Sequence, residues 1–276
     1  MRTVFASALA FAALVATMVT SAEGAESRRA PWLADVEPGD PEPTTAQAPA
    51  DAAHCPADMV YVRGDYCPMV EQVCLSWLPE PTETQQLRCV EFGYDTKCLQ
   101  KTSKKSVCVD KYEAPNKAGE IPVVGVTWYQ AMDACKAHGK RLCTASEWTL
   151  ACEGPERLPY PYGYTRQPAA CSIDKERRIA DEKALMDPGT RAAEMKRLDQ
   201  RTPSGAYASC VTPYGVHDMT GSVDEWVVNE SGKPYQSASK GGYWGPVRTR
   251  CRPTTVAHFE LFSFYQLGYR CCSDPR

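Results

Sequence analysis

The 276-residue sequence lacks the residue patterns that several classes of functional site require. It has four histidines without the H-x3-H spacing of a metal site, which argues against a non-haem iron centre built on histidine. No two cysteines have the C-x2-C spacing of structural zinc sites. The net charge is −3 and no block of lysines and arginines is present, so the electrostatic footprint of a nucleic-acid-binding protein is missing.

Long apolar runs are also absent, apart from one near the start of the chain. Residues 4–19 form a mostly apolar run that is shorter than the about 20 residues of a membrane-spanning helix. Polar, proline-rich sequence follows it, and small residues at Ala22, Gly24 and Ala25 offer cleavage points. We expect residues 1–25 to be a secretory signal peptide, so that the mature protein is secreted or periplasmic and has no membrane span. An uncleaved anchor is the alternative.

Apolar residues are scarce in the next segment, residues 26–54, which is rich in Pro, Ala, Glu, Asp and Thr. Such a segment cannot bury enough surface to offset the entropy lost on ordering. We expect a disordered linker.

Cysteine, in contrast, is plentiful, with 14 residues. In an exported protein this number favours disulfides over metal ligands. A first group has few apolar runs around it, which predicts a cysteine-rich module over residues 55–106 where crosslinks replace core. The remaining eight follow Cys108, so two self-contained sets are possible, although the sequence leaves the pairing open. The first group is Cys55, Cys67, Cys74, Cys89, Cys98 and Cys108.

Two capping boxes predict helices. Thr127 followed by Gln130 precedes a helical spacing of apolar residues, and Gly139 supplies the stop. Thr144 followed by Glu147 forms a second capping box, which predicts a helix that runs to about Cys152. Elsewhere Gly, Pro and Tyr interrupt short apolar runs, so we expect an α+β protein with little regular structure. The charged stretch 174–201 has no clear apolar face and is expected to be a solvated insertion.

A series of motifs from Trp128 onward resembles, in order and spacing, the sulfatase-modifying-factor domain of formylglycine-generating enzymes. The motifs are GVTWYQAMDAC, GKRLCTASEWTLAC, YPYG, YGVHDMTGSVDEW, KGGYW and LGYRCC. The resemblance implies the formylglycine-generating-enzyme fold, which is C-type-lectin-like, over residues 107–274. Family enzymes oxidise a substrate cysteine with two cysteines that follow a Gly-Gly-Ser-Trp turn, and they use copper.

The turn itself departs from the family pattern. Here it reads Gly241-Gly242-Tyr243-Trp244, and residues 245–250 contain no cysteine. A copper(I) site needs soft thiolates, so copper binding is not expected and no residue is assigned a catalytic role. In the family enzymes a Trp lines the active-site cleft beside this turn, and Asp224 stands at the corresponding position here.

The resemblance also implies a structural calcium site. The family loop N-x-x-G-N-x-W-E-W binds calcium through positions that correspond to Asp218, Gly221, Val223 and Glu225, the two inner residues through carbonyls. Hard oxygen ligands of this kind suit calcium. Spacing alone would equally permit an ordinary turn with capping carboxylates.

Two disulfides follow from the same resemblance, Cys135 with Cys271 and Cys152 with Cys251. Cys271 and Cys272 point to opposite faces of a strand, so Cys272 can bond another layer, with Cys143 as a candidate partner.

Cys171 and Cys210 flank the charged insertion and would close it as a loop. We expect the arginines at 248, 250, 252 and 270 to form structural ion pairs, and binding of an anionic ligand is the alternative.

These observations leave two functional hypotheses. The first is a non-oxidase, a calcium-stabilised binding or structural module whose partner is an unknown protein, peptide or small anionic ligand. The second is a formylglycine-generating-type oxidoreductase that acts on a protein cysteine through altered residues. Whether the chain is an enzyme stays open, and the missing cysteine pair favours the first hypothesis.

Overall fold

The computed structural model describes residues 53–79 and 88–276. The expected signal peptide, residues 1–25, and all but the last two residues of the expected linker, 26–54, lie outside the described residues. His54 is described, and its ring stacks on Tyr61 with ring centroids 4.5 Å apart. Within the described residues, no helix is long and apolar enough to cross a bilayer.

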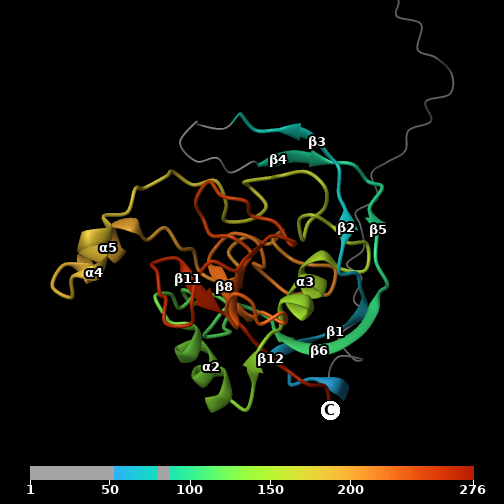
Figure 1. The fold of residues 1–276 in the computed structure, drawn as a ribbon, viewed down its shortest axis with the longest axis horizontal. Helices are drawn as coiled ribbons and strands as arrows, with labels where there is room; N and C mark the ends of the chain where they lie inside the picture. The colour runs from blue at the N-terminus through green and yellow to red at the C-terminus, as the bar shows by residue number, and fades with distance from the viewer. Residues whose placement is uncertain (1–52, 80–87) are drawn as a thin grey trace, which may run out of the picture. The chain divides into compact units, whose positions relative to one another are not determined.

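One sheet holds four antiparallel strands in the order β1, β6, β12, β7 (Figure 1). The strands are β1 Met59–Tyr66, β6 Ser103–Asp110, β7 Arg141–Leu142 and β12 Cys271–Ser273. β1 pairs with β6 along its whole length, and alternate residues Val60 and Val62 enter the core. The boundary expected between residues 106 and 107 therefore falls inside β6.

A second sheet has the order β10, β9, β8, β11, with β8 and β11 parallel. Its strands are β8 Asp224–Val228, β9 Ser237–Lys240, β10 Thr254–Thr255 and β11 Leu267–Tyr269. All four residues of β9 are buried. Only residue 270 separates β11 from β12, so one short segment passes from the second sheet to the first.

Both helices predicted from capping boxes are present. α2 spans Trp128–Ala137 and α3 spans Ala145–Glu153, and each has the complete box, with Thr127 and Thr144 as N-caps. Gly139, with φ 68°, follows α2 in the left-handed conformation that favours glycine. α3 packs between the two sheets, and the side chain of Trp148 is fully buried there. This helix therefore organises the main hydrophobic core.

Two small antiparallel pairs lie beyond the first sheet. β2 Val70–Glu71 pairs with β5 Lys97–Cys98, and β3 Cys74–Trp77 pairs with β4 Cys89–Phe92. No buried apolar residue lies in β2 or β5, and in the other pair Cys89 and Phe92 of β4 are buried in a small cluster with Tyr160. Their disulfides compensate, and all the bonds of the first cysteine group stay within that group: Cys55–Cys108, Cys67–Cys98 and Cys74–Cys89.

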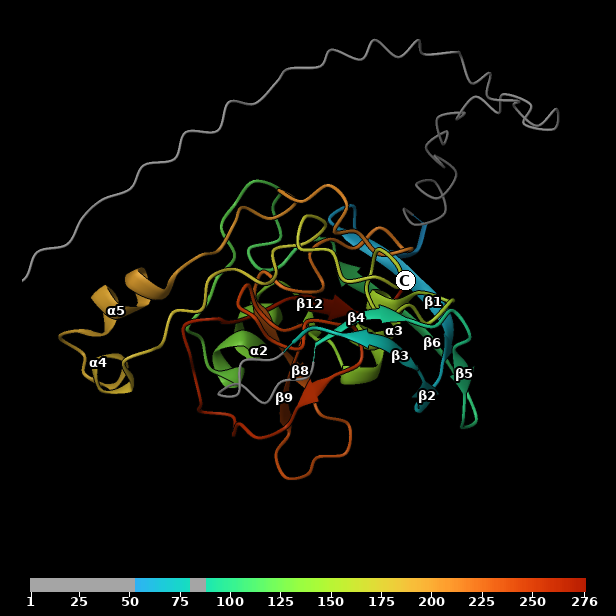
Figure 2. The same cartoon turned by 90° about the horizontal axis from the view of Figure 1, so that it is seen from above.

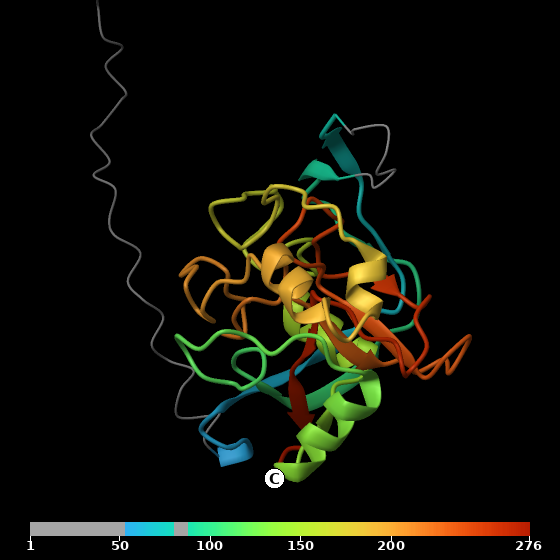
Figure 3. The ribbon, with the colours of Figure 1, turned by 90° about the vertical axis from the view of Figure 1, so that its left-hand side faces the viewer.

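The charged insertion contains two short helices, α4 Glu182–Met186 and α5 Arg191–Leu198. They lie on the opposite side of the domain from β1 and β6 (Figures 1 and 2) and come forward in the view of Figure 3. The expectation of a solvated segment is wrong for Leu185 and Leu198, which are buried in a cluster with Trp244 and Tyr265. The helices that carry the two leucines are too short to show an apolar repeat in the sequence, so this buried face could not be predicted from residue spacing.

The capping box of α3 provides a stability test. Thr144→Ala should lower the free energy of unfolding by about 1 kcal/mol, because it removes the hydroxyl that accepts the backbone N–H of Glu147. Urea denaturation followed by circular dichroism measures this. Ser103→Ala, at the exposed start of β6, is the control and should change little. Equal stability of both variants would contradict the assigned cap.

Candidate functional site

The centre of the candidate site is the turn Gly241–Trp244, directly after β9. Gly241 and Gly242 have φ values of 92° and 72°. A Cβ on Gly241 would lie 2.9 Å from the carbonyl oxygen of Met219, so only glycine fits there without a shift of backbone. The turn lines a cleft of about 270 Å³ together with residues from β8, β9 and the segment 247–267.

No thiol reaches this cleft. All 14 cysteines of the chain are paired in seven disulfides, and none is free. Cys251, the cysteine closest in sequence to the turn, is fully buried and bonded to Cys152. The lining of the cleft includes no cysteine.

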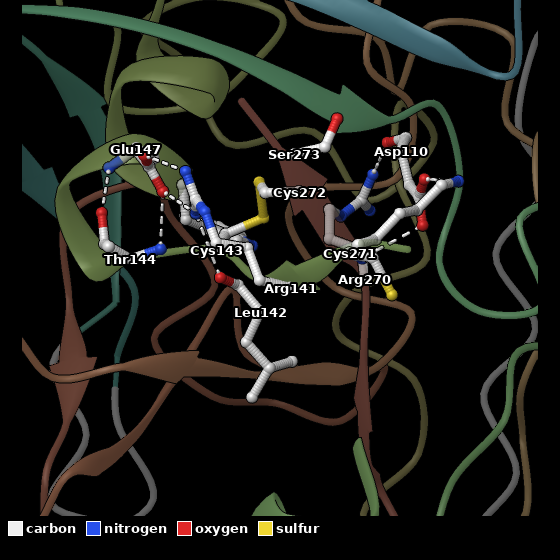
Figure 4. Close-up of a disulfide and its surroundings, with 12 residues drawn as sticks. Asp110, Arg141, Leu142, Cys143, Thr144, Glu147, Arg270, Cys271, Cys272 and Ser273 are labelled. Carbon is white, nitrogen blue, oxygen red and sulfur yellow. Dashed lines mark hydrogen bonds and ion pairs between the residues drawn. A yellow bond between two sulfur atoms is a disulfide. The ribbon is translucent and has the colours of Figure 1, made fainter. Parts of the chain in front are cut away.

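The other bonds of the second group are Cys135–Cys271, Cys143–Cys272 and Cys171–Cys210. The pairs that resemblance implied, Cys135–Cys271 and Cys152–Cys251, are thus the pairs in the structure. Figure 4 shows Cys272 of β12 reaching Cys143, which follows β7, while Cys271 points away from it. The two adjacent cysteines therefore attach β12 to different neighbours.

Beside this disulfide, a polar network closes the start of α3 (Figure 4). Arg141 donates two hydrogen bonds of 2.8 Å to the carboxylate of Glu147, which also accepts the backbone N–H of Thr144 at 2.8 Å. Burial alone would raise the pKa of Glu147, but these bonds hold it below its usual value. The network is structural and lies away from the cleft lining.

Tyr243 takes the position of the family serine and is held by aromatic packing. Its ring meets Trp244 and Tyr265 edge to face, with centroids 5.6 and 6.1 Å apart. The same cluster includes Leu185 and Leu198 of the insertion. The insertion thus covers one side of the turn.

Asp224 and Lys240 are two ionisable residues of the cleft lining. Burial raises the pKa of Asp224 to about 7, although the backbone N–H of Gly242 donates to its Oδ1 at 3.1 Å. Burial lowers the pKa of Lys240 to about 7. The Lys240 Nζ donates to Thr254 Oγ1 at 2.9 Å and to two carbonyls at 3.2 and 3.3 Å, so its donors are already used within the protein.

The expected calcium residues lie in a tight loop before and at the start of β8. Asp218, Gly221 and Ser222 all have left-handed backbones, with φ values of 59°, 77° and 54°. Asp218 is buried and accepts the backbone N–H of Gly205 at 2.7 Å. Burial raises the pKa of Asp218, and the charge of Glu225 adds to the rise.

Glu225 is the most strongly bound of these carboxylates. Arg270 donates to both of its oxygens at 2.7 Å, and the Trp148 indole N–H donates to Oε2 at 2.6 Å. The side chains of Glu225 and Arg270 are both almost fully buried. Removing either partner of such a buried bidentate pair would leave the other charge uncompensated, which strongly lowers the stability of the folded state.

Sequence reasoning missed Glu113, which belongs to the same cluster. Its side chain is fully buried, Oε2 accepts a hydrogen bond of 3.1 Å from Ser204, and Oε1 has no partner within the described residues. Burial raises the pKa of Glu113 well above its usual value, and the nearby Asp218 raises it further. Its sequence neighbourhood, Tyr-Glu-Ala-Pro, contains no pattern that indicates a site.

The cluster contains more acidic than basic side chains. Glu113, Asp218 and Glu225 are three acids, and Arg270 is the cation that the structure sets against them. Among the described residues, no three His, Cys, Asp or Glu side chains are arranged to hold a metal ion. The expected site differs from that arrangement, since it takes two carboxylates and two backbone carbonyls.

Two of the arginines predicted to make structural ion pairs do so. Arg252 donates to both oxygens of Glu153, and Arg270 does the same for Glu225, as predicted. Arg250 instead places its guanidinium 5.3 Å from the centroid of the Phe92 ring. Arg248 is exposed and lines the cleft.

An apolar groove of about 640 Å³ continues from the cleft. Both cavities share His258, Phe262 and Gln266. The groove lies between α4 and the segment 258–266, with Met186 and Leu261 exposed on its walls. Its position makes the insertion part of the surface that a ligand in the cleft would meet.

Comparisons with known proteins identify the family that this chain resembles. The profile of the FGE-sulfatase family, described as "Sulfatase-modifying factor enzyme 1-like domain", matches residues 80–275. The match begins within the segment that sequence analysis assigned to the N-terminal module. "Inactive C-alpha-formylglycine-generating enzyme 2" from Bos taurus is 29% identical over 167 residues, 56% of this chain and 50% of the bovine protein. The chain spans about half the length of this relative.

A second relative matches a shorter part of this chain, and a solved structure matches most of it at lower sequence identity. "Serine/threonine-protein kinase pkn1" from Chlamydia caviae is 38% identical over 106 residues, which cover 38% of this chain and 13% of the kinase. The crystal structure of CarF superposes with a TM-score of 0.50 at 14% identity, covering 79% of this chain and 98% of CarF. At that identity the likeness shows the fold alone.

The complete pairing of cysteines is testable by alkylation. Iodoacetamide added to the denatured, unreduced protein should label nothing, and labelling after reduction should add one group to each of the 14 cysteines. Intact-mass spectrometry distinguishes the two results. Two or more labels before reduction would contradict the pairing.

The buried ion pair gives a second test. Arg270→Met should lower the free energy of unfolding by about 3–5 kcal/mol, because Glu225 would be left buried without its partner. Chemical denaturation measures this. Lys104→Met, which breaks a pair whose side chains are 86% and 51% exposed, is the control and should change stability little. Similar losses in both variants would show that the buried pair has no special role.

Proposed function

We propose that this chain, which belongs to the sulfatase-modifying factor enzyme 1-like family, is a non-oxidase member that serves as a binding or structural module. One observation carries the proposal: the cleft beside the Gly241–Trp244 turn has no thiol, and every cysteine is in a disulfide. The family reaction needs two reactive cysteines after this turn. A scaffold that retains the cleft without the thiols can bind a ligand there.

Two further observations support this reading. The bovine relative is named an inactive formylglycine-generating enzyme, so the family includes members described as lacking the activity. In this chain, Tyr243 and the insertion also occupy the side of the turn where the family serine stands. A bulky aromatic ring and its packed neighbours restrict the space in which a substrate cysteine could approach.

The second candidate remains a formylglycine-generating-type oxidoreductase. Asp224 and Lys240, both with pKa values shifted to about 7 by burial, are the groups in the cleft that favour it, since such values suit proton transfer. Proton transfer alone does not oxidise a cysteine. An oxidising centre would have to be supplied from outside the described residues.

Incubation with a Cys-x-Pro-x-Arg peptide, copper and a thiol reductant distinguishes the two candidates. We expect no change in peptide mass, because no cleft thiol is available to bind copper. An active formylglycine-generating enzyme treated in parallel is the positive control. Loss of the mass that accompanies conversion of the cysteine to formylglycine would favour the oxidoreductase.

The calcium site of the family is part of the proposal. The donors fit a hard cation, because buried carboxylate oxygens of Asp218 and Glu225 lie in one loop with the carbonyls of Gly221 and Val223. The unpartnered Oε1 of Glu113 and the excess of acidic groups support a cation nearby. When bound, calcium would offset this negative charge and stabilise the loop. Arg270 already compensates part of the charge of Glu225.

Thermal unfolding with and without calcium tests this site. Calcium at about 100 times its Kd should add about 2.7 kcal/mol to the free energy of unfolding, since it binds the folded state alone. Asp218→Asn and Glu225→Gln should each reduce that increment, whereas Asp65→Asn, on the exposed end of β1, should not. The increment is compared within each variant, so the loss of the Arg270 contact does not confound it. A Tm indifferent to calcium and chelator in all proteins would refute the site.

We also propose that the protein acts in an oxidising compartment outside the cytoplasm. Seven disulfides in one domain persist most readily where thiols are oxidised. The expected signal peptide is consistent with this placement and lies outside the described residues.

A further inference from the structure

The two small antiparallel pairs form one ribbon at the margin of the domain. Residues 67–79 make its outer arm and residues 88–99 its inner arm, and two disulfides join the arms. Figures 1 and 3 show the ribbon standing out from the domain, and in Figure 1 β4 lies between β3 and the remaining elements. β3 is therefore the outermost strand of the ribbon.

The inner arm is fixed to the domain. Phe92 of β4 is buried beside Tyr160. The backbone N–H of Phe92 donates to the Tyr164 carbonyl at 3.0 Å, and the N–H of Arg166 donates to the Val90 carbonyl at 2.7 Å. One edge of β4 is thus bonded to the domain and the other to β3, so the outer arm stands on a fixed base.

The outer edge of β3 has no strand beside it in the part of the chain that the structure describes. β3 and β4 form a two-stranded sheet, in which the N–H of Gly93 donates to the Val73 carbonyl at 2.9 Å. Successive residues of a strand direct their backbone groups to opposite sides, so Cys74 directs its N–H and C=O away from β4. Backbone groups at such an edge pair readily with a further strand.

The ribbon also carries much of the exposed apolar surface. Of the thirteen large hydrophobic side chains that are exposed among the described residues, six lie on the ribbon, although it is a small part of the chain. Three of the six belong to β3 or precede it directly: Val73, Leu75 and Trp77, which are 52%, 59% and 50% exposed. Together the six present on the order of 500 Å² of apolar surface, an area typical of interaction sites on soluble proteins. The other three are Met69, Tyr94 and Leu99.

The charges of the ribbon indicate which kind of partner fits. Residues 72–79 contain no charged side chain. On the inner arm, Arg88 pairs with Asp174 at 2.8 Å and Lys97 pairs with Asp95 at 3.0 Å, so these charges are compensated within the protein. A neutral, apolar surface offers nothing to a charged partner, and it does not repel a copy of itself.

We propose that β3 is a self-association strand, through which two copies of this chain pair about a two-fold axis. An antiparallel edge fits its own copy, because each N–H and C=O of one strand meets the complementary group of the other. Leu75 and Trp77 of each copy then cover apolar surface of the other across the axis.

The dimer is expected to be weak. β3 has four residues and its pairing with β4 is irregular, so few backbone hydrogen bonds can form and the apolar side chains supply most of the association. A small interface of this kind predicts a Kd on the order of 10 µM.

A lipid bilayer fits this surface less well than a second copy does. The open backbone groups of β3 would enter hydrocarbon without hydrogen-bond partners, which strongly disfavours insertion. Another strand satisfies these groups and covers the apolar side chains at the same time.

Sedimentation velocity of the mature chain, with its disulfides intact, tests the proposal at protein concentrations from about 1 to about 300 µM. The weight-average mass should rise from that of one chain toward that of two. It should change little between about 50 and about 500 mM salt, because no ion pair contributes. The mass of one chain at every concentration would overturn the proposal, as would a dimer that dissociates at high salt.

Variants place the interface. Leu75→Lys should weaken the dimer at least about tenfold, since two like charges then face each other near the axis. Trp77→Lys is a second variant with the same expected effect, and circular dichroism identifies which variants are folded. Leu261→Lys, at a residue of the groove beside α4 that is 66% exposed, is the matched control and should leave the dimer unchanged. An unchanged dimer in the folded ribbon variants, or an equal loss in the control, would overturn the assignment.

Flotation with phosphatidylcholine vesicles tests the lipid alternative, and we expect no binding. A chain that stays monomeric and binds vesicles, with binding lost in Leu75→Lys, would assign the surface to lipid and overturn self-association. None of the exposed apolar side chains of the ribbon lines the cleft beside the Gly241–Trp244 turn. This inference therefore does not rest on the proposed function, which the peptide oxidation assay tests separately.

Discussion

The buried guanidinium of Arg270 is the interaction on which the architecture depends most. Arg270 is the single residue between β11 and β12, so it stands where the chain passes from one sheet to the other. It donates to Glu225 in β8, to the carbonyl of Asp110 in β6 and to the carbonyl of His217. Each sheet thus contributes an acceptor to one side chain. Desolvation makes such a group costly unless every donor is satisfied, which ties the relative position of the sheets to a narrow geometry.

This arrangement separates the scaffold from the chemistry of the family. The scaffold consists of α3, the two sheets and disulfides such as Cys152–Cys251, whose positions are set by buried contacts. The turn Gly241–Trp244 is attached to the end of β9, and the segment that follows it packs without cysteine thiols, since the carbonyls of Val247 and Thr249 accept hydrogen bonds from Arg166. Absence of the cysteine pair is therefore compatible with an intact fold and with the cleft beside the turn.

The sequence could predict the features that depend on nearby residues. Both helices were predicted because Thr127–Gln130 and Thr144–Glu147 act within one turn. The burial of Leu185 was not predictable, because its partners Trp244 and Tyr265 lie far along the chain. In the site, the family resemblance pointed to the Asp218–Glu225 loop but gave no indication of Glu113 or Gln266. Long-range packing leaves the Oε1 of each without a donor among the described residues, and no local sequence pattern predicts this.

The attachment of β12 has a consequence for the order in which the molecule can be assembled. β12 follows in sequence every element that it joins, and its two cysteines bond Cys135 and Cys143 across most of the domain. During synthesis, Cys135 of α2 and Cys143 after β7 leave the ribosome 136 and 129 residues before their partners Cys271 and Cys272. These two cysteines must therefore stay unpaired, or exchange partners, until residues 271 and 272 emerge, whereas the first cysteine group can pair within itself earlier. The full set of native disulfides can then form only after the last strand has been synthesised, so completion of the covalent network is a late event in the folding of this chain.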